Sequence, residues 1–153
     1  MKMENKTEND SRQRILCPVR GGKSSAPTVD KAIELAQTLS APLYLLYIVD
    51  LDFLGLATVA RVKIMADELA ETGEFTLHVL AEKARNRGVS EVECVVREGE
   101  MTQVIREVAD EINATVVLLG QAVRAPGTMQ REDSHMQKIV DSLEAAGMEV
   151  ITP

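Results

Sequence analysis

Hydrophobic side chains along this chain fall into two alternating patterns. Five short apolar runs have the length of β-strands, and several are apolar at successive positions, as is typical of parallel strands covered on both faces. The stretches between them repeat apolar residues every three or four positions, which predicts amphipathic helices. The predicted strands are Arg14–Val19, Leu43–Val49, Glu91–Val96, Thr115–Leu119 and Met148–Ile151.

Three of the helical stretches have recognisable beginnings or stripes. The first carries Ser25 as a candidate N-cap and Pro27 in its first turn. A nearly unbroken apolar stripe predicts a second helix over residues 101–112. The last helix is predicted to begin at Ser134, because Gln137 three residues on completes a capping-box pattern.

The region after the second strand is less regular. A helical pattern covers about residues 57–86, with Gly73 as the candidate break point. It begins inside the dense apolar run of residues 51–62, which we interpret as core-facing helix. A lid or a partner-binding surface is the alternative reading of that run.

The alternation of strands and helices predicts a doubly wound α/β fold with one parallel sheet. We expect a single domain over residues 14–153, preceded by a polar, disordered tail over residues 1–13. Ligands of such sheets bind beyond the carboxyl ends of the strands, where the strand order reverses. If the first and fourth strands flank that point, the loops of residues 20–25 and 120–133 meet there.

Charge and cysteine content narrow the class of protein. The net charge of −7 disfavours nucleic acid or an anionic membrane as partner, since phosphate groups are bound by an excess of Lys and Arg. The N-terminal stretch has no apolar segment of the kind found in a secretory signal, so a cytoplasmic location is expected. Cys17 and Cys94 both lie in apolar runs and are interpreted as small buried hydrophobic residues.

The stretch "CPVRGGKSS" (residues 17–25) resembles a phosphate-binding loop without completing one. In the P-loop pattern a glycine stands five residues before Gly22, but Cys17 occupies that position. In the Ser-Gly-Gly-x-Asp-Ser loop of ATP pyrophosphatases, Arg20 replaces the first serine and Ser24 the aspartate. Neither motif is intact.

The sequence gives only weak evidence for a catalytic or metal-binding site. Asp50 and Asp52 could hold a hard cation, but two carboxylates alone more often form a solvated or salt-bridged pair. His78 and His135 lack any ligand spacing and are interpreted as solvated helix residues. No nucleophile elbow or Cys–His–Asn arrangement is present in the sequence. We therefore assign no catalytic residue and no metal ligand.

Three stretches resemble the universal stress protein family. They are the first strand with its glycine pair, "ILCPVRGG", the second strand, "LYLLYIVD", and residues 95–120, "VVREGEMTQVIREVADEINATVVLLG". The last matches the family's third strand, Gly turn, helix and fourth strand in spacing and residue type. The resemblance covers nearly the whole chain after residue 13. It implies a Rossmann-like five-stranded parallel sheet of order 3-2-1-4-5, with helices on both faces.

The ATP-binding branch of that family carries Gly-x-x-Gly, nine residues, then Gly-Ser/Thr after the fourth strand. On this chain Gly120 and Ser134 match, but the second glycine is Val123 and the third is Asp133. Glycine lets backbone N–H groups approach phosphate closely, whereas a β-branched valine does not and an aspartate repels it. The family's first-strand aspartate is Arg20 here. Conventional ATP binding is therefore not expected.

The resemblance also suggests which residues would hold a ligand if a site is retained. An anion or a modified nucleotide is one possibility, held by basic loop residues and the N-terminus of the first helix. The alternative is a degenerate pocket filled by Arg20 paired with Asp50 or Asp52. The candidate ligand residues are Arg20, Gly21, Gly22, Lys23, Ser24, Val49, Gly120, Arg124 and Ser134.

Family members commonly dimerise by pairing their last strands, so a homodimer is expected here. Its edge would be formed by Met148, Val150, Ile151 and Thr152. The implied function is a non-enzymatic cytoplasmic sensor or accessory protein without conventional ATP binding. One alternative is an adenylating or ATP-pyrophosphatase-like enzyme that uses the "RGGKSS" loop. Another is a regulatory module for a different nucleotide or a phosphorylated metabolite.

Overall fold

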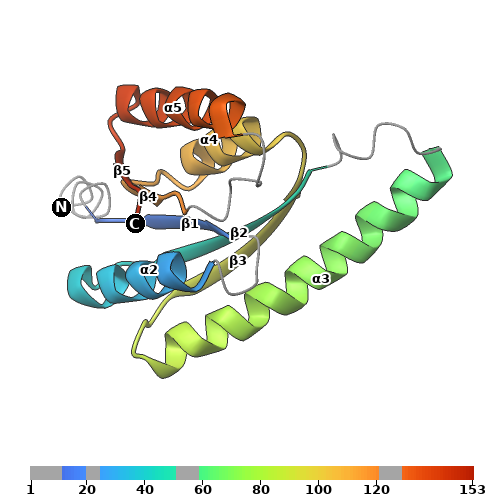
Figure 1. Ribbon diagram of the computed structural model, residues 1–153. Helices are drawn as coiled ribbons and strands as arrows, with labels where there is room; N and C mark the ends of the chain where they lie inside the picture. Colours follow the sequence, from blue (N-terminus) through green and yellow to red (C-terminus); the bar gives the residue numbers. More distant parts are fainter. Residues whose placement is uncertain (1–11, 20–24, 51–58, 121–128) are drawn as a thin grey trace, which may run out of the picture.

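A five-stranded parallel sheet forms the centre of the molecule (Figure 1). The computed structural model describes residues 12–19, 25–50, 59–120 and 129–153. The strands follow the order β3-β2-β1-β4-β5, which confirms the predicted sheet. Their bounds are β1 Ile15–Val19, β2 Leu43–Val49, β3 Val92–Glu98, β4 Val116–Leu118 and β5 Glu149–Ile151.

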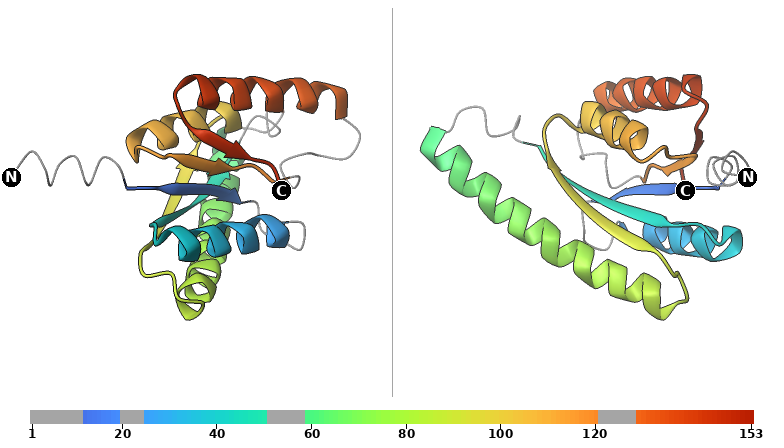
Figure 2. Two further views of the ribbon diagram at one scale, coloured as in Figure 1. Left: turned by 90° about the vertical axis from the view of Figure 1, so that its left-hand side faces the viewer. Right: turned by 180° about the vertical axis from the view of Figure 1, so that it is seen from behind.

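Helices cover both faces of the sheet in two layers (Figure 2). One face carries α2 (Ala26–Leu39) and α3 (Val59–Asn86), and the other carries α4 (Met101–Glu111) and α5 (Met129–Ala145). Each layer has its own apolar cluster against the sheet. In the described part of the chain, no helix is both long and apolar enough to cross a bilayer.

Burial along a strand depends on whether the strand lies at the centre or at the edge of the sheet. All five residues of β1 are buried, with Ile15 and Cys17 in the cluster under α2 and α3, and Leu16 in the cluster under α4 and α5. The edge strand β3 is different, because only its first residue is buried. The prediction that Cys94 is buried is therefore wrong: it lies exposed on this edge strand, and its Sγ contacts the carbonyl oxygen of Leu77 at 3.5 Å.

Helix α3 is continuous through Gly73, so the predicted break at that residue is wrong. The helix spans 28 residues and runs diagonally under the sheet, and its N-terminal half extends past the strand ends (Figure 1). Gly73 is buried against β2, and a Cβ atom built there would lie 2.4 Å from Cδ1 of Tyr47. Glycine is present here because the helix crosses an aromatic ring at close range.

The helix beginnings agree with the sequence patterns only in part. Ser25 stands at the N-cap position of α2 as predicted, although its side chain makes no capping hydrogen bond. The predicted start at Ser134 is wrong, because α5 begins at Met129 and Ser134 lies inside it. Residues 129–133 contain no glycine or proline to stop a helix, and the side-chain amide of Gln137 donates forward to Asp141 at 2.8 Å.

Candidate functional site

The strand order reverses between β1 and β4. Ile15 aligns with Leu43 of β2 on one side and with Val116 of β4 on the other. The chain leaves β1 for α2 on one face and leaves β4 for α5 on the opposite face. The first and fourth strands therefore flank the switch point, as predicted, and the crevice beyond their carboxyl ends is the expected ligand site.

Several candidate ligand residues follow these two strands directly. The loop after β1 holds Arg20, Gly21, Gly22, Lys23 and Ser24, and the loop after β4 holds Arg124. All six fall outside the described residues. The same is true of Asp52, one of the two aspartates proposed to pair with Arg20.

The flanks of the two loops meet in a contact between α2 and the end of β4. Gly120 is buried, and a Cβ atom built on it would lie 2.2 Å from Oγ1 of Thr28. No ordinary side chain fits that gap, so Gly120 is required by the packing of α2 over the sheet. The glycine that matches the family's ATP-binding pattern thus has a purely structural reason to be there.

Thr28 brings a polar group to the switch point that the sequence reading did not select. The residue is 5% exposed, and its hydroxyl has no hydrogen-bond partner among the residues that are described. A buried hydroxyl without a partner is costly and is often completed by water or a ligand. One signal was available in the sequence: Thr28 lies one turn before Ala32, on the apolar stripe of the helix.

The two remaining described candidates, Val49 and Ser134, are not available to a ligand at this contact. Val49 ends β2 with its side chain buried, and its carbonyl oxygen already accepts a hydrogen bond from the N–H of Gly99 at 3.0 Å. Ser134 lies in the second turn of α5 rather than at a helix N-terminus. Of the candidates that are described, the structure therefore brings only Gly120 against the beginning of α2.

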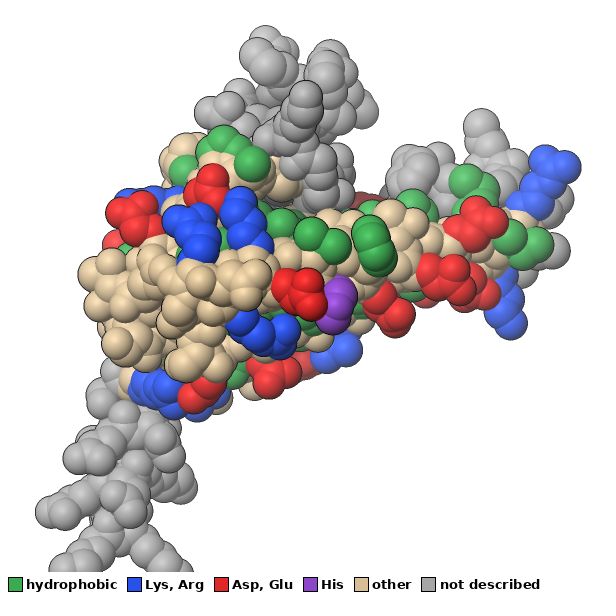
Figure 3. Space-filling model, turned by 90° about the horizontal axis from the view of Figure 1, so that it is seen from below, with side chains coloured by type: hydrophobic (Ala, Val, Ile, Leu, Met, Phe, Trp, Pro, Cys, Tyr) green, Lys and Arg blue, Asp and Glu red, His purple; other side chains and the backbone are tan. Residues whose placement is uncertain are grey.

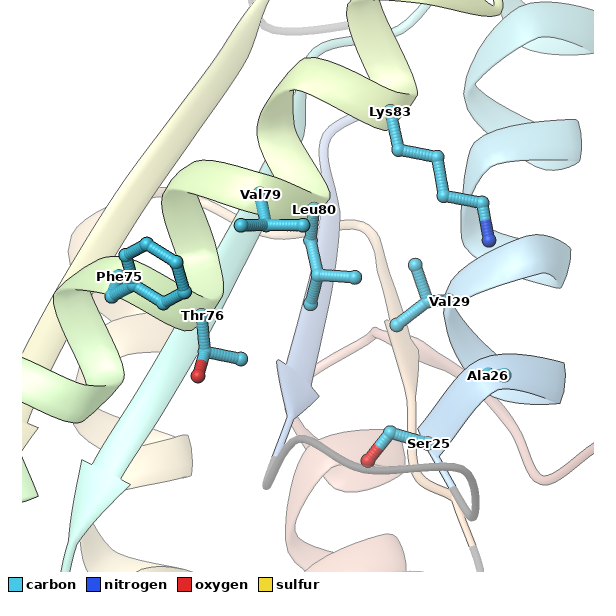
Figure 4. A pocket seen from close by; sticks show the side chains of 8 residues that line it. All are labelled: Ser25, Ala26, Val29, Phe75, Thr76, Val79, Leu80 and Lys83. Carbon is cyan, nitrogen blue, oxygen red and sulfur yellow. The ribbon is translucent and has the colours of Figure 1, made fainter.

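A separate cleft of about 270 Å³ opens beside the N-terminus of α2, between α2 and α3 (Figure 4). The side chains of Val29 and Leu80 point toward each other across it, and Ser25 lies at its lower end in this view. The walls are mainly apolar, and none of the candidate ligand residues lines them. The lining residues are Ser25, Ala26, Val29, Phe75, Thr76, Val79, Leu80 and Lys83.

An ion-pair cluster closes the upper end of this cleft. The carboxylate of Asp30 on α2 accepts hydrogen bonds from Nζ of Lys83 at 2.8 Å and from Nη1 of Arg87 at 3.1 Å. The hydrogen bond from Lys83, followed by the charges of both cations, holds the pKa of Asp30 below its usual value. The cluster ties α2 to the C-terminal part of α3, but its exposure limits its contribution to stability.

The groups that could act as nucleophiles or metal ligands do not form a reactive centre. Burial raises the pKa of the Cys17 thiol to about 12, so it stays protonated at neutral pH. The thiol of Cys94 is only partly buried, and this partial burial also raises its pKa. His78 is exposed on α3 beside Glu82, as predicted for a solvated helix residue. Within the described ranges, no three His, Cys, Asp or Glu residues gather as a metal site would require.

Comparison with known sequences supplies the family. The sequence profile described as the universal stress protein family matches residues 11–131, most of the chain. The chain belongs to the universal stress protein family. It is also 27% identical over 109 residues to the universal stress protein MJ0531 of Methanocaldococcus jannaschii. That match covers 71% of this chain and 64% of the relative, so it spans less than two thirds of that protein.

Solved universal stress proteins share the fold at low sequence identity. UspA from Lactobacillus plantarum superposes with a TM-score of 0.76 at 20% identity, over 92% of this chain and 97% of that one. A universal stress protein from Archaeoglobus fulgidus, solved in complex with dAMP, gives a TM-score of 0.58 at 20% identity, over 92% and 96% of the two chains. These likenesses establish the universal stress protein fold for this chain.

Proposed function

We propose that this universal stress protein is a non-catalytic cytoplasmic sensor or accessory protein that does not bind ATP in the family's usual manner. The contact between Gly120 and Thr28 carries the proposal. It explains by helix packing why Gly120 is a glycine, so the match of Gly120 to the family pattern is no evidence for a triphosphate site. Val123 and Asp133 stand where the family's ATP-binding branch has its other two glycines.

A smaller ligand fits the residues better than ATP does. The relative from Archaeoglobus fulgidus is a complex with dAMP, a nucleotide with one phosphate. In this chain, the unpartnered hydroxyl of Thr28 faces the switch point, and Arg20 and Lys23 supply positive charge in the loop before α2. We therefore propose a nucleoside monophosphate or another phosphate-bearing molecule as the ligand of the crevice.

A thermal-shift screen with phosphate, sulfate, AMP, dAMP, cyclic AMP and ATP with Mg²⁺ tests this proposal. We expect the monophosphates to raise the melting temperature and ATP to have the smaller effect. The Arg20→Asp variant restores the family residue yet should lose the phosphate effect, because one charged hydrogen bond contributes about 1.5–3 kcal/mol. If no anion shifts the wild type and Arg20→Ala lowers its melting temperature, Arg20 closes a degenerate pocket and the ligand proposal is wrong.

We also propose that two copies pair along the free edge of β5. Glu149 and Ile151 direct their backbone groups toward β4, since the N–H of Glu149 donates to Thr115 and the carbonyl of Ile151 accepts from Leu119. By the alternation of a strand, the N–H and carbonyl of Val150 point to the free edge. Val150 and Ile151 are half-buried there and Thr152 is exposed, whereas Met148 is packed in the core and contributes little to the edge.

The Val150→Pro variant tests this pairing without disturbing the bonds between β4 and β5. Proline removes the N–H of Val150, which is the donor within β5 that faces outward. We expect the wild type to scatter light as a dimer and the variant to shift toward monomer with its fold retained by circular dichroism. A monomeric wild type at working concentrations would rule the pairing out.

A further inference from the structure

The outer face of α3 carries most of the large apolar side chains that are exposed in the described chain. Ile64 is 58% exposed, Met65 37%, Phe75 70% and Val79 48%, and Leu39 on α2 is the one other large apolar side chain exposed in the described ranges. Exposure of one such residue is ordinary, but a row of them on one helix commonly marks a binding surface.

These side chains lie on one side of the helix, away from the sheet. Ile64, Phe75 and Val79 belong to a series with three- and four-residue steps that also includes Glu68 and Thr72. The residues of α3 that pack on the sheet, such as Ala66, Leu77 and Ala81, fall on the opposite side. The apolar row spans about 22 Å along the helix axis, which is the length of about four turns.

The same stretch is strongly acidic. Residues 64–82 contain Asp67, Glu68, Glu71, Glu74 and Glu82, and no Lys or Arg. Asp67, Glu71 and Glu74 follow the edge of the row that faces away from α2, because helical spacing places them opposite the residues that line the cleft. Figure 3 shows the green and red side chains along α3, with blue side chains toward its two ends.

The apolar row continues sideways into the cleft between α2 and α3. Phe75 and Val79 belong both to the row and to the lining of the cleft, and Figure 4 shows them on α3 opposite Val29 and Ala26. An anchor side chain of a bound segment can therefore enter the cleft while its other apolar residues lie along α3. This is the arrangement by which an amphipathic helix binds a groove.

We propose that the outer face of α3, from Ile64 to Glu82, binds a basic amphipathic helix of another protein. Its apolar stripe would cover the row and fill the cleft, and its Lys and Arg residues would face the acidic edge. A second copy of this chain is the poorer occupant, because antiparallel pairing of two α3 helices about the middle of the row brings the carboxylate of Glu71 close to its own equivalent. An anionic membrane would be repelled by the same carboxylates.

A peptide probe tests the surface directly. The protein has no tryptophan, so an 18-residue Leu/Lys amphipathic peptide with a single Trp reports binding by a blue shift of its own emission. We expect saturable binding, at least tenfold weaker for a peptide of the same composition with the leucines scattered round the helix. A Leu/Glu peptide of the same stripe should not bind.

Two double variants, each with a matched control, separate binding at this surface from nonspecific attraction of the peptide to the protein. The double variant Ile64→Ser with Phe75→Ser should lower the affinity for the Leu/Lys peptide at least tenfold, whereas Leu39→Ser on α2 should not. The double variant Glu68→Lys with Glu71→Lys should lower the same affinity, most strongly at low salt, whereas Glu144→Lys on α5 should not. The proposal would be overturned if the peptide with scattered leucines bound as tightly as the amphipathic peptide. Unchanged affinity in both double variants would overturn it too. A wild-type dimer that Ile64→Ser with Phe75→Ser converts to monomer would identify a second copy as the occupant and overturn it as well.

Discussion

In the described part of the molecule, two helix crossings depend on glycine, and they lie in very different places. At one, α2 passes over the end of β4, and a Cβ on Gly120 would meet Thr28 at 2.2 Å. At the other, α3 passes over β2, and a Cβ on Gly73 would meet the ring of Tyr47 at 2.4 Å. The first crossing stands at the ligand end of the sheet and the second has no relation to it.

The comparison shows that one physical requirement can resemble a functional motif. Both glycines exist because a helix approaches the sheet too closely for a side chain. Only Gly120 also matches a family pattern for nucleotide binding, and its structural role removes much of the weight of that match. The two crossings differ in how freely the opposing side chain can move, because Thr28 is buried and β-branched whereas the Tyr47 ring is half-buried.

The largest effect is expected at the first crossing. Gly120→Ala should lower the free energy of unfolding by about 2–3 kcal/mol, because the buried Thr28 cannot turn away from the added methyl group. Urea unfolding of Gly120→Ala, Thr28→Ala and the double variant measures the coupling between the two positions. Thr28→Ala should recover much of the loss. Additive effects would mean that Gly120 serves something other than this packing.

Gly73→Ala should have a smaller effect, whose sign depends on Tyr47. When Tyr47 is present, the added methyl group pushes against its ring. This cost outweighs the gain of about 1 kcal/mol that alanine normally gives over glycine inside a helix. The net result should be a loss of about 1 kcal/mol. In a Tyr47→Ala background the same substitution should stabilise the protein, and thermal melts of the four proteins would show the change of sign. Destabilisation in both backgrounds would contradict the crossing.

These crossings also show what the sequence could and could not predict. Strand positions and sheet order followed from apolar runs and from the family resemblance, and the structure confirms them. The continuity of α3 through Gly73 could not be read, because it depends on a ring from a strand 26 residues earlier. The exposure of Cys94 was missed although the predicted strand order already places its strand at the sheet edge, where an apolar run does not by itself mean burial. Thr28 was overlooked although a threonine within a buried stripe is a visible signal.

The smallest effect concerns the ion pairs that join the two crossing helices. The pKa of Asp30 is held below its usual value mainly by its hydrogen bond from Lys83. Its contribution to stability is therefore present above the unfolded pKa and is lost as the pH falls through the folded one. Asp30→Asn should cost about 0.2–1 kcal/mol at pH 7, as exposed pairs usually do. The difference between variant and wild type in urea unfolding should shrink toward pH 3. A constant difference across that range would exclude the ion pairs as its source.

The central claim is that Gly120 is retained for helix packing and that the crevice no longer binds ATP as the family's ATP-binding branch does. Calorimetric titration of the purified wild type with ATP and Mg²⁺ tests it most directly. We expect binding no tighter than about millimolar, which corresponds to a free energy of roughly −4 kcal/mol. A micromolar dissociation constant, or ATP that remains bound through purification, would contradict it.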